Sequence, residues 1–146
     1  MPMLSPYDRV WLDRALVAIA AAEKGPSKSD LSTAPKLNLW IPQVNYRGEL
    51  VLEGEVKAHP ILGDDVIITS PLIALDPDRR WARTTSRWYR LGQCQLVTEQ
   101  EETAHFHRLK IAPPNREQMQ RRLAVYIEHL KQQDEEDRKA QAEANH

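Results

Sequence analysis

The spacing of apolar residues predicts a helix near the start of the chain. Leu12, Leu16 and Ile19 recur at helical intervals, which is typical of a stripe that faces a core. The serine and proline at residues 5–6 form a helix start, because the hydroxyl can cap backbone amides and proline suits the first helical position. The glycine and proline at residues 25–26 then end the helix.

A different pattern follows the helix. Residues 25–36, GPSKSDLSTAPK, are small, polar and proline-containing, which predicts a surface loop or linker. Apolar and polar residues then alternate in residues 37–44 and 49–57, and residues 66–75 form a longer apolar run interrupted by Pro71. Alternation with period two is typical of half-buried strands. These runs predict a small antiparallel meander, curled into a sheet or open barrel.

Residues 79–92, RRWARTTSRWYRLG, continue this series and read as one further strand. Their β-branched and aromatic residues suit a pleated surface. In a single strand, period two would divide them into a bulky cationic face and a second face. The first face holds Trp81, Arg83, Thr85, Arg87, Tyr89 and Leu91; the second holds Ala82, Thr84, Ser86, Trp88 and Arg90.

The last part of the chain is mostly helical in pattern. Residues 93–112 are ambiguous, and a short helix is favoured over a strand there. Asn115 can cap the helix that follows, with Gln118 three residues later. Its apolar stripe is Met119, Leu123, Tyr126, Ile127 and Leu130. Residues 131–146 lack such a stripe, so we expect a polar tail that frays or is disordered.

These elements predict an α+β fold, with an N-terminal helix, a small sheet and a long C-terminal helix. We expect one domain over residues 1–130, because the 146-residue chain is long enough for one core. The net charge is -1, which gives no long-range attraction to a polyanion or a membrane. No run of 18 apolar residues is present, and the single cysteine, Cys94, suits a reducing compartment. The sequence therefore predicts a cytoplasmic protein without a membrane segment.

Charge is distributed unevenly along the predicted sheet. Residues 48–78 contain seven acidic residues and one lysine, whereas residues 79–97 contain five arginines and no acidic residue. In one interpretation, Arg83 or Arg87 pairs across strands with Glu53 or Glu55, a contact worth roughly 0.2 to 1 kcal/mol. In the other, residues 79–92 form a surface that docks a protein partner, since arginine and aromatic side chains are enriched at interface hot spots. The candidate binding residues are Trp81, Arg83, Arg87, Trp88, Tyr89 and Arg90.

The same side chains also suit single-stranded nucleic acid, where aromatic rings stack on bases and arginines pair with phosphates. Neighbouring acidic residues weigh against a polyanion. No phosphate-binding, dinucleotide or nucleophile-elbow motif is present. His105 and His107 form an H-x-H pair, but only Cys94, His59 and scattered acidic residues could add ligands, whereas structural zinc normally has four N or S ligands. The sequence therefore predicts a non-catalytic binding or regulatory protein without metal or cofactor.

Residues 69–92, TSPLIALDPDRRWARTTSRWYRLG, resemble the signature of a family of small uncharacterised bacterial proteins, chiefly alpha-proteobacterial. The matching parts are TSP, LDP, WART, SR and, after an aromatic residue, Y with RLG. They cover about a sixth of the chain. The resemblance implies a common fold and no particular activity. The long C-terminal helix is expected to be an addition to the shorter family pattern.

Overall fold

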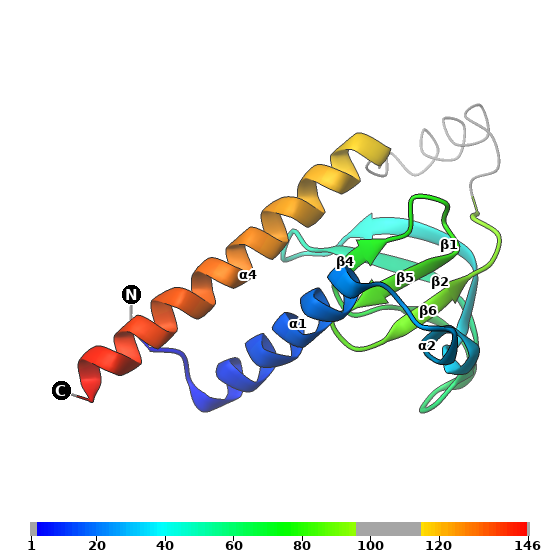
Figure 1. Ribbon diagram of the computed structural model, residues 1–146. Coiled ribbons are helices and arrows are strands. Elements are labelled where there is room, and N and C mark those ends of the chain that lie inside the picture. The colour runs from blue at the N-terminus through cyan, green and yellow to red at the C-terminus, as the bar shows by residue number, and fades with distance from the viewer. Residues whose placement is uncertain (1–2, 96–114, 146) are drawn as a thin grey trace.

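A curled six-stranded sheet forms one end of the molecule, and two long helices extend from it side by side (Figure 1). The computed structural model describes residues 3–95 and 115–145. In chain order, the elements are α1 (Pro6–Lys24), α2 (Lys28–Thr33), β1 (Lys36–Val44), β2 (Leu50–His59), β3 (Gly63–Ile68), β4 (Leu72–Leu75), β5 (Trp81–Thr84), β6 (Trp88–Leu91) and α4 (Arg116–Ala144). The predicted α+β class and its arrangement of helix, sheet and long C-terminal helix are confirmed.

The strand order is β3-β2-β1-β6-β5-β4, which differs from a simple meander. β1 and β6 pair in parallel, whereas the other neighbouring strands pair antiparallel, so the sheet is mixed. β3 and β4 follow each other in the chain yet lie at opposite edges. Only residues 69–71 join them, a connection that spans at most about 14 Å. The sheet must therefore curl until its two edges approach each other at this end.

The inside of the curl is the main core. Leu37, Leu52 and Leu72 are fully buried there, from three different strands. The pattern of β2 explains its part, because Leu52, Gly54 and Val56 alternate with the more exposed Glu53, Glu55 and Lys57; Val51, expected on the outer face, is also buried. The cluster consists of Leu37, Trp40, Leu50, Leu52, Val56, Ile67, Leu72, Ala82, Tyr89 and Met119.

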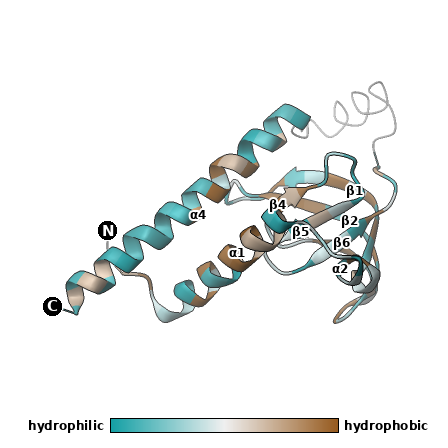
Figure 2. Ribbon diagram, viewed as in Figure 1, coloured by the Kyte–Doolittle hydropathy of each residue, from teal (hydrophilic) through white to brown (hydrophobic). Residues whose placement is uncertain are grey.

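A second apolar cluster joins the helices to the sheet. Leu12 and Ile19 of α1 and Leu130 of α4 pack around Ile73 of β4. Figure 2 shows the contrast between the two helices, since α1 is strongly apolar in its second half, whereas α4 is hydrophilic along most of its length. α4 is thus held by a few apolar residues. No helix in the described part of the chain is long and apolar enough to cross a membrane.

The expected helix starts are confirmed. The hydroxyl of Ser5 accepts a hydrogen bond from the backbone N–H of Asp8 at the start of α1. Asn115 and Gln118 form a reciprocal capping box at the start of α4. The loop predicted for residues 25–36 is wrong in part, because it contains the short helix α2. Ser27 and Asp30 cap that helix reciprocally, which a serine followed three residues later by an acid makes possible.

The expected frayed tail is replaced by continuous helix, because α4 extends to Ala144. Asp137 is 2% exposed, and its carboxylate accepts hydrogen bonds from the backbone N–H of Leu4 (2.8 Å) and from Nη1 of Arg9 (3.0 Å). Nη2 of Arg9 donates to Asp134 one turn earlier. The polar tail therefore finds charged partners in α1 in place of an apolar stripe. We call Arg9, Asp134 and Asp137 the helix clasp.

The helix clasp should make stability depend on pH. Hydrogen bonds from Leu4 and Arg9 lower the pKa of Asp137; burial would raise the pKa of Asp134, but hydrogen bonds from Arg9 and Arg138 lower it. A carboxylate whose pKa is lower in the folded state than in the unfolded chain stabilises the fold at pH values above its unfolded pKa. This contribution is lost as the pH falls below about 4. We expect Asp137→Asn to lower the melting temperature at pH 7, and the difference from wild type to shrink as the pH falls below about 4.

Thermal melts followed by circular dichroism at neutral and acidic pH measure this effect. Glu143→Gln is the matched control, since Glu143 is exposed near the end of the same helix. Equal melting temperatures for wild type and Asp137→Asn at pH 7 would show that the clasp contributes nothing to stability.

Candidate binding surface

Residues 79–92 form a β-hairpin, so the prediction of a single strand is wrong. β5 and β6 pair antiparallel, with Trp81 opposite Arg90 and Arg83 opposite Trp88. The reversal brings together side chains that a single strand would place on opposite faces. It also changes which of the candidate binding residues can act together.

The reversal depends on Thr84. Its backbone N–H donates to the carbonyl of Arg87 (2.9 Å), and its Oγ1 accepts from the backbone N–H groups of Ser86 and Arg87, each at 3.2 Å. Threonine and serine hydroxyls that bond the backbone two or three residues later are a known turn device. The sequence TTSR therefore carried a turn signal, which competed with the β-branched pattern of a strand.

Four candidate residues lie on the outer face of this hairpin, the face directed away from the main core: Trp81, Arg83, Trp88 and Arg90. The rings of Trp81 and Trp88 meet edge to face, with 5.4 Å between centroids. The guanidinium of Arg83 lies 5.3 Å from the centroid of Trp88, and its Nε donates to the carbonyl of Thr84 (3.0 Å). Burial lowers the pKa of Arg83, and the nearby carboxylate of Asp30 opposes this shift. Arg83 and Trp88 thus stabilise the hairpin, whereas Arg90 is exposed.

Tyr89 and Arg87 lie elsewhere. Tyr89 is 3% exposed in the main core, and its ring centroid is 6.5 Å from that of His59. Burial raises the pKa of Tyr89, while the positive charge of Arg87 lowers it. Burial, followed by the charge of Arg87, lowers the pKa of His59. Arg87 therefore acts electrostatically on the His59 and Tyr89 side of the sheet, away from the outer face.

The predicted pairing of Arg83 or Arg87 with Glu53 or Glu55 is wrong. β5 lies between β4 and β6, whereas β2, which carries the two glutamates, lies between β3 and β1. Glu53 instead accepts a hydrogen bond from the side chain of Gln43. Among the described residues, no ion pair engages Arg83 or Arg87. The expected charge pairing failed because the strand order was not a meander.

The sheet register places further cations beside Arg90. Lys36 of β1 lies directly opposite Arg90 of β6, and Lys57 of β2 lies directly opposite Lys36. All three residues are exposed, and Trp81 lies opposite Arg90 at the end of the series. We call Arg90, Lys36 and Lys57 the cationic row. Sequence reasoning missed the two lysines, because only the pairing of β1 with β2 and β6 brings them to this surface.

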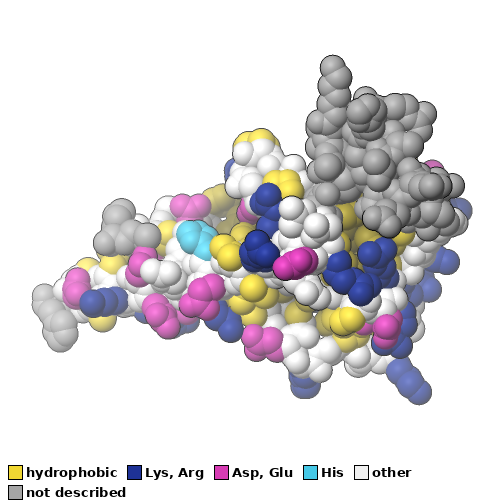
Figure 3. Space-filling view, turned by 90° about the horizontal axis from the view of Figure 1, so that it is seen from above, with side chains coloured by type: hydrophobic (Ala, Val, Ile, Leu, Met, Phe, Trp, Pro, Cys, Tyr) yellow, Lys and Arg dark blue, Asp and Glu magenta, His cyan; other side chains and the backbone are white. Residues whose placement is uncertain are grey.

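The cationic row is partly oriented by the backbone. Nε of Arg90 donates to the carbonyl of Ala34 (3.0 Å), just after α2. Glu55, which is exposed two residues before Lys57, places one carboxylate on the same face of β2. In the space-filling view from above, Lys and Arg side chains gather at the sheet end of the molecule (Figure 3). The surface is therefore locally cationic in a chain whose net charge is -1.

The described residues contain no cluster of side chains typical of a metal site. Within residues 3–95 and 115–145, no group of three or more His, Cys, Asp or Glu side chains is arranged to hold a metal ion. The H-x-H pair, His105 and His107, and the helix favoured within residues 93–112 lie outside the described residues, apart from residues 93–95.

Comparison with known proteins places this chain in a family. No curated protein and no solved structure matches the chain. A family model does match residues 2–112, which include α1, the complete sheet and the cationic row, and this match ends before α4 begins at Arg116. The chain therefore belongs to a family of unknown function, DUF6634.

Proposed function

We propose that this protein is a non-catalytic binding protein that docks an acidic segment of a partner protein on the outer face of its sheet. The cationic row of Arg90, Lys36 and Lys57, with Trp81 at its end, is the observation that carries the proposal. Like charges directly opposite each other on neighbouring strands destabilise a sheet. Carboxylates of a bound partner would offset that repulsion.

The composition of the surface also supports a protein partner. Arginine and tryptophan are enriched among residues that dominate binding energy, because they bury a large area in well-packed contacts. Trp81 is held in place by its edge-to-face contact with Trp88, and Arg90 by its bond to Ala34. Side chains that are already oriented lose less entropy on binding. A docking role thus needs little rearrangement of the outer face.

Single-stranded nucleic acid is the second candidate, since Trp81 beside three cations could stack on a base while the cations contact phosphates. Glu55 on the same face of β2 would repel a polyanion at close range. We therefore favour the protein partner. The resemblance of residues 69–92 to bacterial proteins and the single cysteine support placing this activity in a bacterial cytoplasm.

The double variant Lys36→Gln, Arg90→Gln tests the proposal. We expect it to weaken binding of a fluorescein-labelled polyglutamate peptide of about twelve residues by about tenfold, a loss of about 1.4 kcal/mol. Because both side chains are exposed, we expect the free energy of unfolding to change by no more than about 0.5 kcal/mol. Fluorescence anisotropy at about 50 mM salt, where charge contacts are least screened, measures the affinity.

The control Arg14→Gln, Lys139→Gln removes two charges from exposed positions on α1 and α4. It should leave the affinity unchanged. An oligothymidine of similar length is the second probe. The nucleic-acid alternative would be favoured if the protein bound this oligonucleotide more tightly than the peptide. The logarithm of the binding constant should then fall with the logarithm of the salt concentration, with a slope of about -0.7 per phosphate contact. If neither probe binds, or if the control weakens binding equally, the cationic row is not a docking surface.

A further inference from the structure

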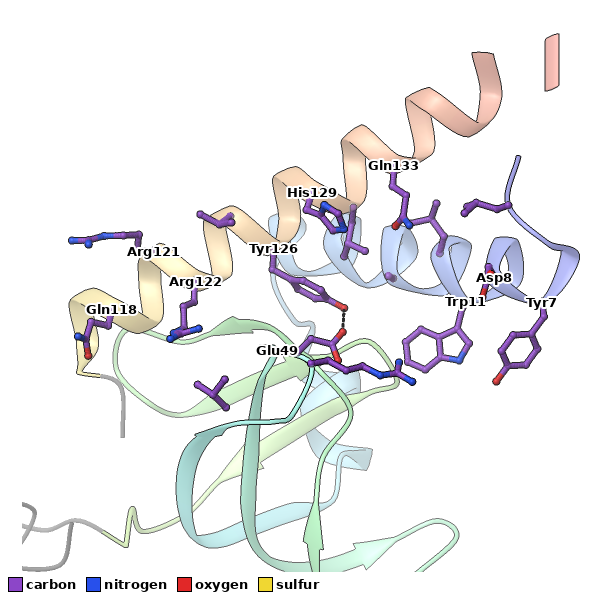
Figure 4. Close-up of a pocket in the computed structure, with 18 residues that line it drawn as sticks. Tyr7, Asp8, Trp11, Glu49, Gln118, Arg121, Arg122, Tyr126, His129 and Gln133 are labelled. Carbon is purple, nitrogen blue, oxygen red and sulfur yellow. Dashed lines mark hydrogen bonds between the residues drawn. The ribbon is translucent and has the colours of Figure 1, made fainter. Parts of the chain in front are cut away.

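A long groove lies between α1 and α4, on residues distinct from the outer face of the sheet. Its volume is about 1220 Å³, and the turn between β1 and β2 forms its floor. Figure 4 shows that α1 contributes Tyr7, Asp8 and Trp11, while α4 contributes side chains from Gln118 to Gln133. The sequence does not predict this groove, because its walls come from three parts of the chain that are far apart in sequence.

Hydrogen bonds fix the floor of the groove to its α4 wall. The hydroxyl of Tyr126 donates to Oε2 of Glu49 (3.2 Å), and Nδ2 of Asn45 donates to Oε1 of the same carboxylate (3.1 Å). Oδ1 of Asn45 accepts from the backbone N–H groups of Arg47 and Glu49. Burial and the charge of Glu49 raise the pKa of Tyr126 well above its usual value, so the phenol remains a donor. The groove is therefore formed before any partner binds.

One end of the groove is aromatic and apolar. Tyr7 and Trp11 lie one turn apart on α1 and are 73% and 40% exposed. Val125 on the α4 wall is 64% exposed, one turn from Arg121 and Arg122 and therefore nearer the opposite end. Large aromatic side chains contribute the most apolar area to an interface, and grouped exposed apolar residues commonly mark a binding site.

The other end is cationic. Arg121 and Arg122 of α4 lie at the opposite end from Tyr7 and Trp11 (Figure 4). Among the described residues, no ion pair engages Arg122 or Arg47, whereas Arg121 pairs with Glu117 on the helix surface. The carboxylate of Glu49 is already occupied by Tyr126 and Asn45. Asp8, the other acidic residue of the lining, lies beside Tyr7 and Trp11 on α1, so the charge offered at the end formed by Arg121 and Arg122 is positive.

The size of the groove indicates the kind of occupant. Small-molecule sites usually enclose about 300 to 1,000 Å³. An α-helix about 10 Å wide, which rises 1.5 Å per residue, fills a volume of 1220 Å³ with roughly ten residues. Two flanking helices and a hairpin also offer the setting in which amphipathic helices are bound, with their apolar face in the groove.

We propose that this groove binds an acidic amphipathic helix of a partner protein. Apolar side chains spaced at i, i+3, i+4 and i+7 pack on Trp11 and Tyr7, and carboxylates at the other end of the helix pair with Arg122. The site is additional to the cationic row. Its cationic wall belongs to α4, which lies beyond the residues matched by the family model.

A peptide selection on the full-length protein tests the proposal. A phage-displayed library of random sixteen-residue peptides is selected on wild type, and enriched peptides are synthesised with a fluorescent label for anisotropy. The expected peptides combine an acidic cluster with apolar residues at helical spacing. Trp11→Ala should weaken their binding about tenfold or more, as expected for a central aromatic contact. Arg122→Glu should weaken them similarly, and replacing their acidic residues by lysine should restore binding to that variant.

Matched controls lie on the same helix as Trp11. Val17→Ala and Arg14→Glu change exposed residues of α1 that do not line the groove, so they should leave affinity unchanged. Some peptides could lose affinity for the double variant Lys36→Gln, Arg90→Gln and bind Trp11→Ala normally. Such peptides would bind the cationic row, and this result would contradict the proposal of a helix-binding groove. The proposal also fails if no peptide is enriched, if enriched peptides lack acidic residues, or if the groove interaction proves to be self-association in ultracentrifugation.

Discussion

Replacing Trp40 by alanine should lower the free energy of unfolding by about 3 to 5 kcal/mol, the usual cost of truncating a large aromatic residue in a core. Trp40 is 1% exposed and belongs to the main core cluster. Its Nε1 donates to the carbonyl of Gly92 (3.1 Å), and the guanidinium of Arg79 lies 5.8 Å from its ring centroid. The substitution removes these contacts together and leaves a cavity between β1 and the end of β6.

Urea denaturation at equilibrium measures this loss as a shift of the transition midpoint. Val17→Ala is the control, since Val17 is 64% exposed and its truncation should change stability by no more than about 0.5 kcal/mol. If Trp40→Ala does not fold, Trp40→Phe keeps most of the apolar area and removes the indole hydrogen bond, at a cost of about 1 to 3 kcal/mol. An unchanged midpoint for both variants would contradict the placement of Trp40 in the core.

The second large effect should come from Thr84→Val, which keeps the shape of the side chain and removes its hydroxyl. Thr84 is fully buried, and its Oγ1 accepts from the N–H groups of Ser86 and Arg87 and donates to the carbonyl of Arg87. Backbone groups that lose a buried partner cost about 1 to 3 kcal/mol. We expect a loss of that size in urea denaturation, because the turn between β5 and β6 depends on these bonds.

Thr85, the next residue, provides a control for which no loss of stability is expected. Oγ1 of Thr85 is buried and has no hydrogen-bond partner among the described residues. Replacing a buried hydroxyl without a partner by a methyl group should be neutral or stabilising. Thr85→Val should therefore leave the urea midpoint unchanged or raise it. Similar losses from the two substitutions would show that the hydroxyl of Thr84 does not hold the turn.

The two proposed sites differ in how far they should extend through the family. Lys36, Lys57, Trp81 and Arg90 all lie within residues 2–112, the part matched by the family model. Docking on the outer face is therefore a role that other members could share. The groove needs α4, so we expect helix binding only in chains that carry this helix.

Local patterns in the sequence were enough to predict the two long helices and most strands, whereas the short helix α2 was missed. Ser5, Asn115 and Gln118 act as caps because their side chains meet backbone groups only three residues away. The alternation in β2 and the proline between β3 and β4 are equally local signals. The period of apolar residues and the caps of helices depend on residues that are close in sequence, so they can be recognised without the tertiary structure.

Signals that compete locally were harder to read. Residues 79–92 have both the β-branched composition of a strand and the hydroxyl residues of a turn, and the turn prevails because Thr84 is buried with its hydroxyl bonded. The backbone of Leu39 adopts a φ of 49°, and the register between β1 and β2 shifts beside it. This irregularity lets both Leu37 and Trp40 point into the core, which period two does not allow.

Only the tertiary structure decided which distant residues meet. The parallel pairing of β1 with β6 places Lys36 opposite Arg90, across 54 residues of chain, and removes the expected contact between Arg83 and the glutamates of β2. Arg9 likewise reaches Asp137 across 128 residues and turns an expected tail into ordered helix. Such contacts depend on strand order and helix packing, which are set by the burial of the whole core rather than by any local pattern of residues.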